Sequence, residues 1–366
     1  MKKMKQNYLH WQQVGTKKSN SLSGDTSFKK GKVMNVAISG FGRIGRNFLR
    51  VLLQDQEALK KLNIVGINIG PGNPHFVAHS FKYDTLLGMY PGNVKMEGDT
   101  LVIDDMRIKI LTETDPEKLP WKELNVNWVV ESSGKFTQKN LAEKHCNAGA
   151  QRVLISAPSK DADATVIMGV NQNSFDDSKD KIVSIGSCTT NALAPLLKVI
   201  NDKFGIESAY MTTIHSYTND QVLLDVEHSD IRRGRAAALN IIPTTTGAMK
   251  VVEKILPELK GKVAGSALRV PVAKVSLIDL SFVAQKAITK QALNDALTAA
   301  QNGPMQGVLA VTDEPLVSVD FSQNDNSVIV DGLLTEVIGS LGKVFGWYDN
   351  EWAYSCRLKD FLIKCV

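Results

Sequence analysis

The pattern of apolar positions near the start of the chain predicts a βαβ unit. Residues 33–38 form a short, β-branched apolar run, which is typical of a buried strand. A glycine-rich turn follows at 40–45, then apolar side chains at helical spacing within 47–59, and a second apolar run at 62–69. Strand, turn, helix and strand in this order predict the opening of a parallel sheet.

The pattern then changes along the chain. More short apolar runs are expected to extend the first sheet, at 101–103, 126–130, 153–155 and 182–185. From about residue 210 the apolar runs lengthen, which favours a mixed or antiparallel sheet, with strands at 210–214, 275–284 and 327–330. The last residues, 352–366, predict an amphipathic helix that packs back onto the first domain.

The glycine turn carries candidate chemistry. Gly40, Gly42 and Gly45 form a G-x-G-x-x-G pattern between a predicted strand and a predicted helix, the context that gives this pattern its meaning as a dinucleotide site. The end of the second strand should carry an acid for the ribose hydroxyls, but Ile69 stands there. The choice between NAD and NADP is therefore left open.

Charge excludes one class of function for the body of the chain. The formal net charge is +5, but residues 1–33 hold eight lysines and a single acid, Asp25, so the remainder is slightly negative. A general nucleic-acid footprint is not expected there. Residues 1–32 are predicted to be a disordered Lys-rich tail. No run approaches the roughly 18 apolar residues of a membrane helix, so no membrane association is expected.

Cys188 is the candidate nucleophile. The four cysteines (Cys146, Cys188, Cys356 and Cys365) show no C-x-x-C pair or regular disulfide spacing, which favours a reduced, cytoplasmic setting. Cys188 follows a predicted strand within S-C-T-T-N and is expected to begin a helix, whose N-terminus stabilises a thiolate. Cys356 and Cys365 lie in more apolar runs typical of core cysteines.

His215 is the candidate base. It ends a predicted strand and is followed by polar residues, an arrangement that suits a general base facing a cleft. His145 and His228 lie in polar stretches that are expected to be exposed. Cysteine and histidine beside a dinucleotide site predict aldehyde oxidation through a thiohemiacetal and a thioester. No metal site is predicted.

Together these motifs resemble the phosphorylating glyceraldehyde-3-phosphate dehydrogenase family over nearly all of residues 33–366. The resemblance rests on the glycine turn, S-C-T-T-N at 187–191, R-R-G-R at 232–235, L-R-V-P at 268–271 and W-Y-D-N-E-W at 347–352. It implies an α/β fold with a Rossmann-type NAD(P)-binding domain at 33–187. An α+β catalytic domain with a mixed or antiparallel sheet is implied at 188–350, and a C-terminal helix at 351–366.

The resemblance also implies roles by position. Thr218 and Arg269 match residues that hold the C3 phosphate of the substrate. The attacking inorganic phosphate is assigned to Ser187, Thr189, Arg233, Thr246 and Gly247. The cofactor, NAD with NADP left open by Ile69, is assigned to Gly40, Gly42, Arg43, Ile44, Gly45, Ile69, Ser133, Gly134, Ser156 and Asn350. The family is homotetrameric, and the loop after His215 lies near the cofactor of a neighbouring subunit.

Two other functions stay open at this point. A sister activity oxidises erythrose 4-phosphate, although those relatives tend to carry Glu where this chain has Ile69. A surface or nucleic-acid-binding protein with vestigial catalysis would instead depend on the Lys-rich tail. The presence of Cys188, His215, Thr218 and Arg269 argues against vestigial catalysis.

Overall fold

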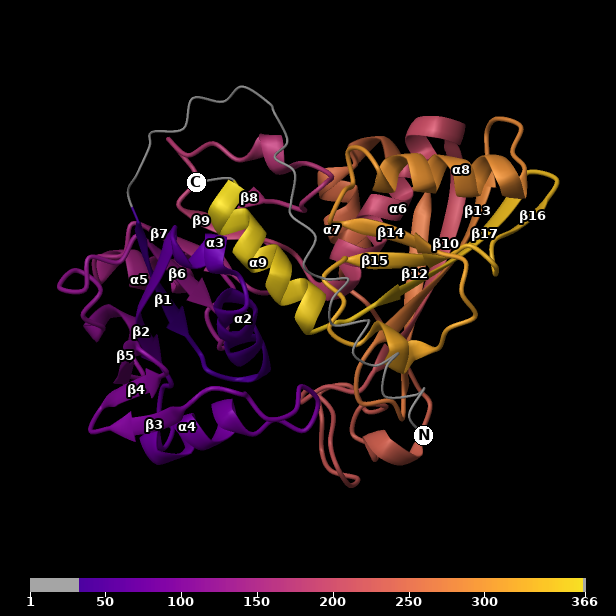
Figure 1. Cartoon of the computed structure of the whole chain (residues 1–366). Helices are drawn as coiled ribbons and strands as arrows, with labels where there is room; N and C mark the ends of the chain where they lie inside the picture. Colours follow the sequence, from indigo (N-terminus) through magenta and orange to yellow (C-terminus); the bar gives the residue numbers. More distant parts are fainter. Residues whose placement is uncertain (1–32, 365–366) are drawn as a thin grey trace, which may run out of the picture. The chain divides into compact units, whose positions relative to one another are not determined.

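The computed structural model describes residues 33–364 (Figure 1). The predicted Lys-rich tail at 1–32 lies outside these residues, as do the last two residues of the predicted C-terminal helix. Within the described part, two sheets form, of nine and of eight strands. The predicted α/β fold class with one mainly parallel and one mixed sheet is confirmed.

The first sheet is built around β1 (Met34–Ser39), the predicted first strand. It lies between β2 (Leu62–Asn68) and β6 (Trp128–Glu131), and all three are parallel and largely buried. On one side the sheet continues in parallel through β7 (Arg152–Ile155), β9 (Ile182–Ser184) and β8 (Ala164–Thr165). On the other side β5 (Met106–Leu111) is followed by the antiparallel strands β4 (Thr100–Ile103) and β3 (Val94–Glu97).

The helix after β1 is shorter and begins earlier than the spacing of apolar residues predicts. Helix α2 (Arg43–Leu53) begins directly after Gly42, and a separate turn, α3 (Gln56–Leu59), follows. The break falls at Asp55, whose carboxylate accepts hydrogen bonds from the N–H groups of Glu57 and Ala58 and so caps a new helix. The other segments here are α4 (Pro74–Lys82), α5 (Lys139–Asn147), η1 (Pro116–Lys118) and η2 (Gln172–Ser174).

The second sheet is mixed, and its central strand is β10 (Ile206–Ser216). This strand pairs in parallel with β12 (Val263–Val270) and antiparallel with β13 (Ser276–Ala284). The sheet is completed by β11 (Ile242–Thr244), β17 (Leu341–Tyr348), β15 (Val328–Asp331), β14 (Leu309–Thr312) and β16 (Glu336–Ile338). The helical segments are α6 (Cys188–Phe204), α7 (Ala248–Ile255), α8 (Lys290–Gln301), η3 (Ala237–Leu239), η4 (Pro257–Leu259) and η5 (Ser318–Phe321).

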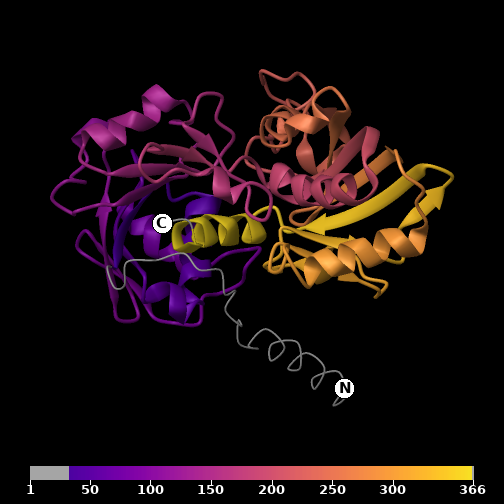
Figure 2. The same cartoon turned by 90° about the horizontal axis from the view of Figure 1, so that it is seen from above.

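The last helix, α9 (Trp352–Lys364), lies against α2 (Figures 1 and 2). Its buried side chains Leu358 and Phe361 join the apolar core between the first sheet and α2. Phe361 meets Trp128 of β6 edge to face, with ring centroids 5.5 Å apart. The chain therefore returns from the second sheet to pack on the first. Residues 347–352, where β17 leads into α9, lie beside the functional side chains described below.

Candidate functional site

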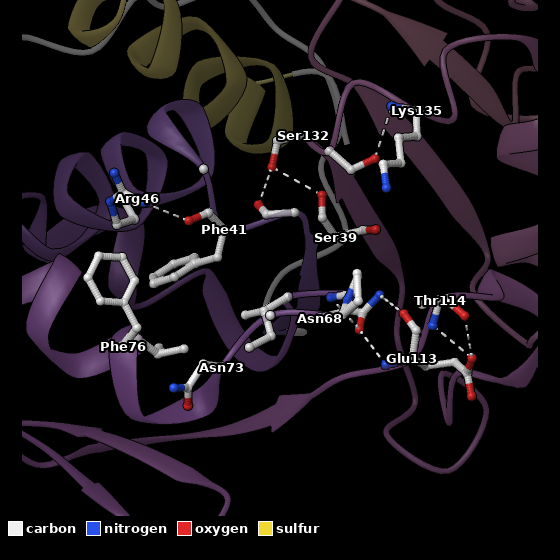
Figure 3. A pocket seen from close by; sticks show the side chains of 18 of the residues that line it. Ser39, Phe41, Arg46, Asn68, Asn73, Phe76, Glu113, Thr114, Ser132 and Lys135 are labelled. Carbon is white, nitrogen blue, oxygen red and sulfur yellow. Dashed lines mark hydrogen bonds between the residues drawn. The ribbon is translucent and has the colours of Figure 1, made fainter. Parts of the chain in front are cut away.

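A cavity of about 370 Å³ lies at the carboxyl ends of β1, β2 and β6 (Figure 3). Ligands of open parallel sheets bind at this edge. The side chains and backbone that line it include Ser39, Gly40, Gly42, Arg46, Asn68, Ile69, Phe76, Glu113, Thr114, Ser132, Ser133, Lys135 and Phe136. Four of the predicted cofactor residues, Gly40, Gly42, Ile69 and Ser133, are among them.

The glycine turn has the geometry that a dinucleotide needs. A Cβ on Gly42 would meet nothing within 4 Å, so the open side of this residue faces free space. Gly42 precedes α2 with no side-chain cap, which leaves the first N–H groups of the helix available to a pyrophosphate. Gly40 has φ +92°, and a Cβ there would meet Ser133 N at 2.4 Å. On Gly45 it would meet Gly40 O at 2.2 Å, because strand and helix pack closely. These residues fit a bound dinucleotide.

The remaining predicted cofactor residues do not line this cavity. The Arg43 side chain turns away to Asp84 and Glu351, and Ile44 packs against the apolar core. Gly134 is exposed with φ +75°, and Ser156 donates its backbone N–H to Glu131 O at 2.9 Å. Asn350 is buried beside the second sheet, as described below.

Ile69 is apolar in both its chemistry and its contacts. It directly follows β2 and packs against the apolar core of the first sheet, and a Cβ on Gly72 would meet its Cδ1 at 3.2 Å. The neighbouring Asn68 side chain is already engaged, because its Nδ2 donates to Glu113 O at 3.0 Å and its Oδ1 accepts from Glu113 N at 3.1 Å. Neither side chain reproduces the ribose-binding carboxylate.

Cys188 occupies the first turn of α6, as the sequence predicts. Ser187 caps this helix by accepting a hydrogen bond from Thr190 N at 3.1 Å. Cys188 as a residue is partly buried, and its sulfur lies 3.5 Å from Nε2 of His215. Burial raises the pKa of the Cys188 thiol, and this outweighs the opposing effects of Arg269 and the first backbone N–H groups of α6. The site therefore holds a thiol beside an imidazole.

His215 lies one residue before the end of β10 and is buried. Burial, with a further contribution from the charge of Arg269, lowers the pKa of His215 to about 3. The ring is therefore neutral at physiological pH. Its Nδ1 lies 2.7 Å from Ser216 O, while Arg269 Nη1 lies 2.7 Å from Nδ1 and donates to Ser216 O at 3.0 Å. Arg269 Nη1 only donates, so its contact favours the tautomer in which Nδ1 accepts and Nε2 carries the proton. In the other tautomer Nδ1–H donates to Ser216 O, and the Nε2 lone pair faces the Cys188 sulfur.

Tyr348 supports this pair and was not identified from the sequence. Its hydroxyl lies 3.1 Å from Thr189 Oγ1 and 2.7 Å from Thr213 Oγ1, and its ring meets His215 edge to face at 5.9 Å. Tyr348 lies in the W-Y-D-N-E-W segment, which was the available signal. The tyrosine therefore fixes the start of α6 to β10.

Asn350 is held in a single orientation by two serines. Its Oδ1 accepts hydrogen bonds from Ser216 Oγ at 2.8 Å and Ser276 Oγ at 3.1 Å. Because Oδ1 is already engaged twice, the amide nitrogen is the atom of this side chain available to a ligand.

The predicted phosphate residues separate into two groups. Arg269 contacts His215 and Ser216, with its Nε buried and without a partner among the described residues. Arg233 instead pairs with Asp220 and donates from Nε to Thr244 Oγ1 at 3.0 Å. Thr246 caps the start of α7 by accepting from Ala248 N at 3.2 Å. Thr218 is partly buried and Gly247 is exposed, with no Cβ neighbour within 4 Å. No bond joins Arg233 to Ser187 or Thr189 in the described chain.

Residues 33–364 contain neither a candidate metal site nor a candidate membrane-spanning helix. No group of three or more His, Cys, Asp or Glu side chains in this range is arranged to hold a metal ion. No helix in the same range is long and apolar enough to cross a membrane.

Comparison with known proteins identifies the family. Residues 34–139 match the family described as glyceraldehyde 3-phosphate dehydrogenase, NAD binding domain, and residues 187–350 match its C-terminal domain. A relative from Streptomyces avermitilis, named glyceraldehyde-3-phosphate dehydrogenase 2, is 47% identical over 90% of this chain and 98% of its own. The chain belongs to the glyceraldehyde 3-phosphate dehydrogenase family. The predicted resemblance is confirmed.

Family members from other lineages are equally similar. A relative from Chlamydomonas reinhardtii, named glyceraldehyde-3-phosphate dehydrogenase A, chloroplastic, is 50% identical over 90% of this chain and 88% of its own. One from Geobacillus stearothermophilus is 47% identical over 89% and 96%. The NAD binding match covers β1, α2 and β2, so the cavity at their carboxyl edge belongs to the NAD-binding part of the chain.

Proposed function

We propose that the protein is a phosphorylating glyceraldehyde-3-phosphate dehydrogenase. It oxidises D-glyceraldehyde 3-phosphate with NAD and inorganic phosphate to 1,3-bisphosphoglycerate, as in glycolysis or gluconeogenesis, through a thioester on Cys188. One observation carries the proposal: the Cys188 sulfur lies 3.5 Å from His215 Nε2, in a family member whose first sheet holds a dinucleotide cavity.

The residues act in a fixed order. Cys188 attacks the aldehyde carbon while its proton passes to His215 Nε2 and on to the carbonyl oxygen, which gives a thiohemiacetal. His215 then takes the hydroxyl proton as the aldehyde carbon is oxidised. Bound NAD supplies the two-electron acceptor. The acyl group stays on sulfur until inorganic phosphate attacks the thioester, which releases the acyl phosphate and the Cys188 sulfur.

A direct assay tests the proposal. Full-length protein is incubated with D-glyceraldehyde 3-phosphate, with NAD and NADP in parallel, with and without inorganic phosphate. We expect sustained turnover that requires phosphate. Erythrose 4-phosphate in the same assay tests the sister activity, and a higher kcat/KM for it would overturn the assigned substrate. Tail-deleted and full-length protein compared for RNA and anionic-vesicle binding test a role of the Lys-rich tail.

The same proposal gives each part of the chain a role. We assign residues 33–187 to dinucleotide binding, residues 188–350 to catalysis and residues 351–366 to a helix that serves the first domain. The two family matches, at 34–139 and 187–350, support this division. The proposed setting is the cytoplasm, as the cysteine pattern favours.

We propose a homotetramer, as the resemblance to the family implies, and an exposed apolar loop supports an interface between subunits. The segment after His215 exposes large apolar side chains, namely Leu223, Leu224, Val226, Ile231, Leu239 and Ile241. Several large apolar side chains exposed in one segment are typical of protein interfaces. In the assembly, the resemblance puts this loop near the cofactor of a neighbouring subunit.

Substitution of two arginines should distinguish the site for the substrate phosphate from the site for inorganic phosphate. Arg269→Leu should raise KM for the aldehyde, and Arg233→Leu should raise KM for inorganic phosphate. Each removes a charge-assisted interaction worth about 1.5–3 kcal/mol, or roughly 10- to 150-fold. Steady-state kinetics with each ligand varied in turn measures both. Arg107→Leu, an exposed arginine on β5, is the matched control. Normal KM values for both ligands in both variants would remove these roles.

Cofactor preference should follow position 69. Ile69 neither bonds the ribose nor repels a 2′-phosphate, and no arginine or lysine occurs at 69–73 to attract one, so we expect NAD to be preferred with measurable NADP activity. Ile69→Asp should tighten NAD by one or two hydrogen bonds of about 0.5–1.5 kcal/mol each and suppress NADP. Ile69→Asn is the control, because it restores the acceptor without the charge.

The measurement is kcat/KM for each cofactor in the wild type and both variants. A wild-type efficiency at least about tenfold higher with NADP would contradict the preference, since a ratio of that size needs about 1.4 kcal/mol in favour of the phosphate. It would indicate a biosynthetic, NADPH-linked member of the family.

A further inference from the structure

A buried carboxylate lies behind the wall of the dinucleotide cavity. Glu131 ends β6 and is 1% exposed, while His145 of α5 and Trp121 are both 0% exposed. None of the three has a part in the chemistry proposed above. The Trp121 and His145 rings also pack together, with centroids 6.2 Å apart.

Hydrogen bonds fix the protonation of this cluster. Trp121 Nε1 lies 3.0 Å from His145 Nδ1, and an indole nitrogen only donates, so Nδ1 must accept. The proton of the neutral ring is then on Nε2, which lies 3.1 Å from Glu131 Oε2 and donates to it. Glu131 Oε1 accepts from Ser133 N at 2.8 Å and from the Ser133 hydroxyl. The bonds are all consistent with an ionised carboxylate that accepts from every partner.

Both ends of the cluster reach the cavity. Ser133 lines it, and so does Phe136, whose ring meets His145 edge to face at 5.9 Å. The same segment contacts the glycine turn, because Ser132 Oγ donates to Gly40 O at 2.7 Å and a Cβ on Gly40 would meet Ser133 N at 2.4 Å. A shift of Ser133 would therefore displace both the wall of the cavity and the phosphate-facing turn.

We propose that Glu131 and His145 are positioning residues for the dinucleotide, which hold residues 132–136 in the shape that binds NAD. This inference rests on the proposed function, since it assumes that NAD occupies the cavity. The side chains do not touch the ligand. They act through Ser133 and Phe136, and the indole of Trp121 determines which ring nitrogen of His145 carries the proton.

The proton arrangement gives a sharp test. In Glu131→Gln, the new amide can accept from Ser133 through oxygen, but its nitrogen then faces His145 Nε2–H donor to donor. The ring cannot move its proton to Nδ1, because Trp121 donates there. Trp121→Phe removes that obstacle, so in the double variant Nδ1–H becomes available and Nε2 accepts from the amide. Although Trp121→Phe itself leaves a cavity, adding it to Glu131→Gln should therefore restore NAD binding.

The dissociation constant of NAD is measured by calorimetry on full-length protein, with kcat normalised to Cys188 titrated by alkylation. We expect Glu131→Gln to raise the dissociation constant of NAD roughly tenfold, because a hydrogen bond to a charged group is lost. The value of kcat should change less than about twofold. Trp121→Phe alone should bind NAD within about twofold of wild type, and the double variant should recover to within about threefold. If the variants lost only packing, the double variant would have a lower melting temperature and would not recover NAD affinity.

A second pair of variants serves if Glu131→Gln does not fold. His145→Gln keeps one acceptor and one donor and should bind NAD within about twofold of wild type, whereas His145→Met should weaken it roughly fivefold or more. Unchanged NAD affinity in Glu131→Gln, no recovery in the double variant, or equal affinities in the two His145 variants would overturn the positioning role. Wild-type protein that neither binds NAD nor oxidises the aldehyde would instead overturn the proposed function.

Discussion

Cys188→Ser should abolish aldehyde oxidation. A serine hydroxyl near its ordinary pKa is a far weaker nucleophile than a thiolate, and the helix N-terminus and His215 cannot compensate for that difference. Turnover is measured by NADH absorbance with saturating aldehyde, NAD and phosphate. Because Ser187 still caps α6 and the substitution is nearly isosteric, folding and NAD binding should be retained.

Alkylation provides an independent test of the same assignment. Iodoacetamide should label Cys188 faster than the other cysteines, because this residue is only partly buried and its sulfur lies beside an imidazole that can accept its proton. Burial raises the pKa of Cys146 and Cys356 as it does that of Cys188, but neither of these two thiols has a histidine partner among the described residues. Cys146→Ser is the matched control and should keep full turnover. Labelling of Cys146 first, with activity intact, would disprove the assignment.

Local patterns were sufficient to predict the parts of the site that depend on one segment at a time. Residues 33–45 carry a strand and a glycine turn in immediate succession, so the position of the dinucleotide cavity follows from the rule for parallel sheets. Cys188 begins α6 because polar capping residues follow a buried strand, and capping is a local property. The limits of α2 were less accurate, because the cap at Asp55 interrupts a continuous apolar spacing.

Contacts between distant segments were not predictable in this way. Thr189 and Tyr348 are 159 positions apart, and only the folded second sheet brings their hydroxyls together. Arg269 reaches His215 because β10 and β12 pair in register. The expectation that His145 is exposed was wrong: α5 is polar in sequence, yet this side chain is fully buried because Glu131 and Trp121 satisfy both ring nitrogens. The expected exposure of His228 was also wrong, since it is half-buried.

His215→Asn should keep the fold and lower turnover by roughly 10² to 10⁴, the usual contribution of general acid–base catalysis. The wild-type site holds a thiol whose pKa burial raises, beside an imidazole whose pKa burial and Arg269 lower to about 3, so the ring is neutral at neutral pH and can take up a proton. Asparagine can bond to Ser216 O but cannot accept and return the proton.

The sign of the pH effect follows from the same two groups. Without the imidazole, the Cys188 thiol must ionise to solvent, so alkylation of the variant should be slower near neutral pH and should recover as the pH rises through the raised pKa of the thiol. Initial rates of turnover and of iodoacetamide labelling from pH 6 to 9 measure both effects. His79→Asn, an exposed histidine on α4, should behave as wild type. Turnover of the His215 variant that matched wild type across this range would exclude His215 as the base, because no other histidine of the described chain lies within hydrogen-bonding distance of the Cys188 sulfur.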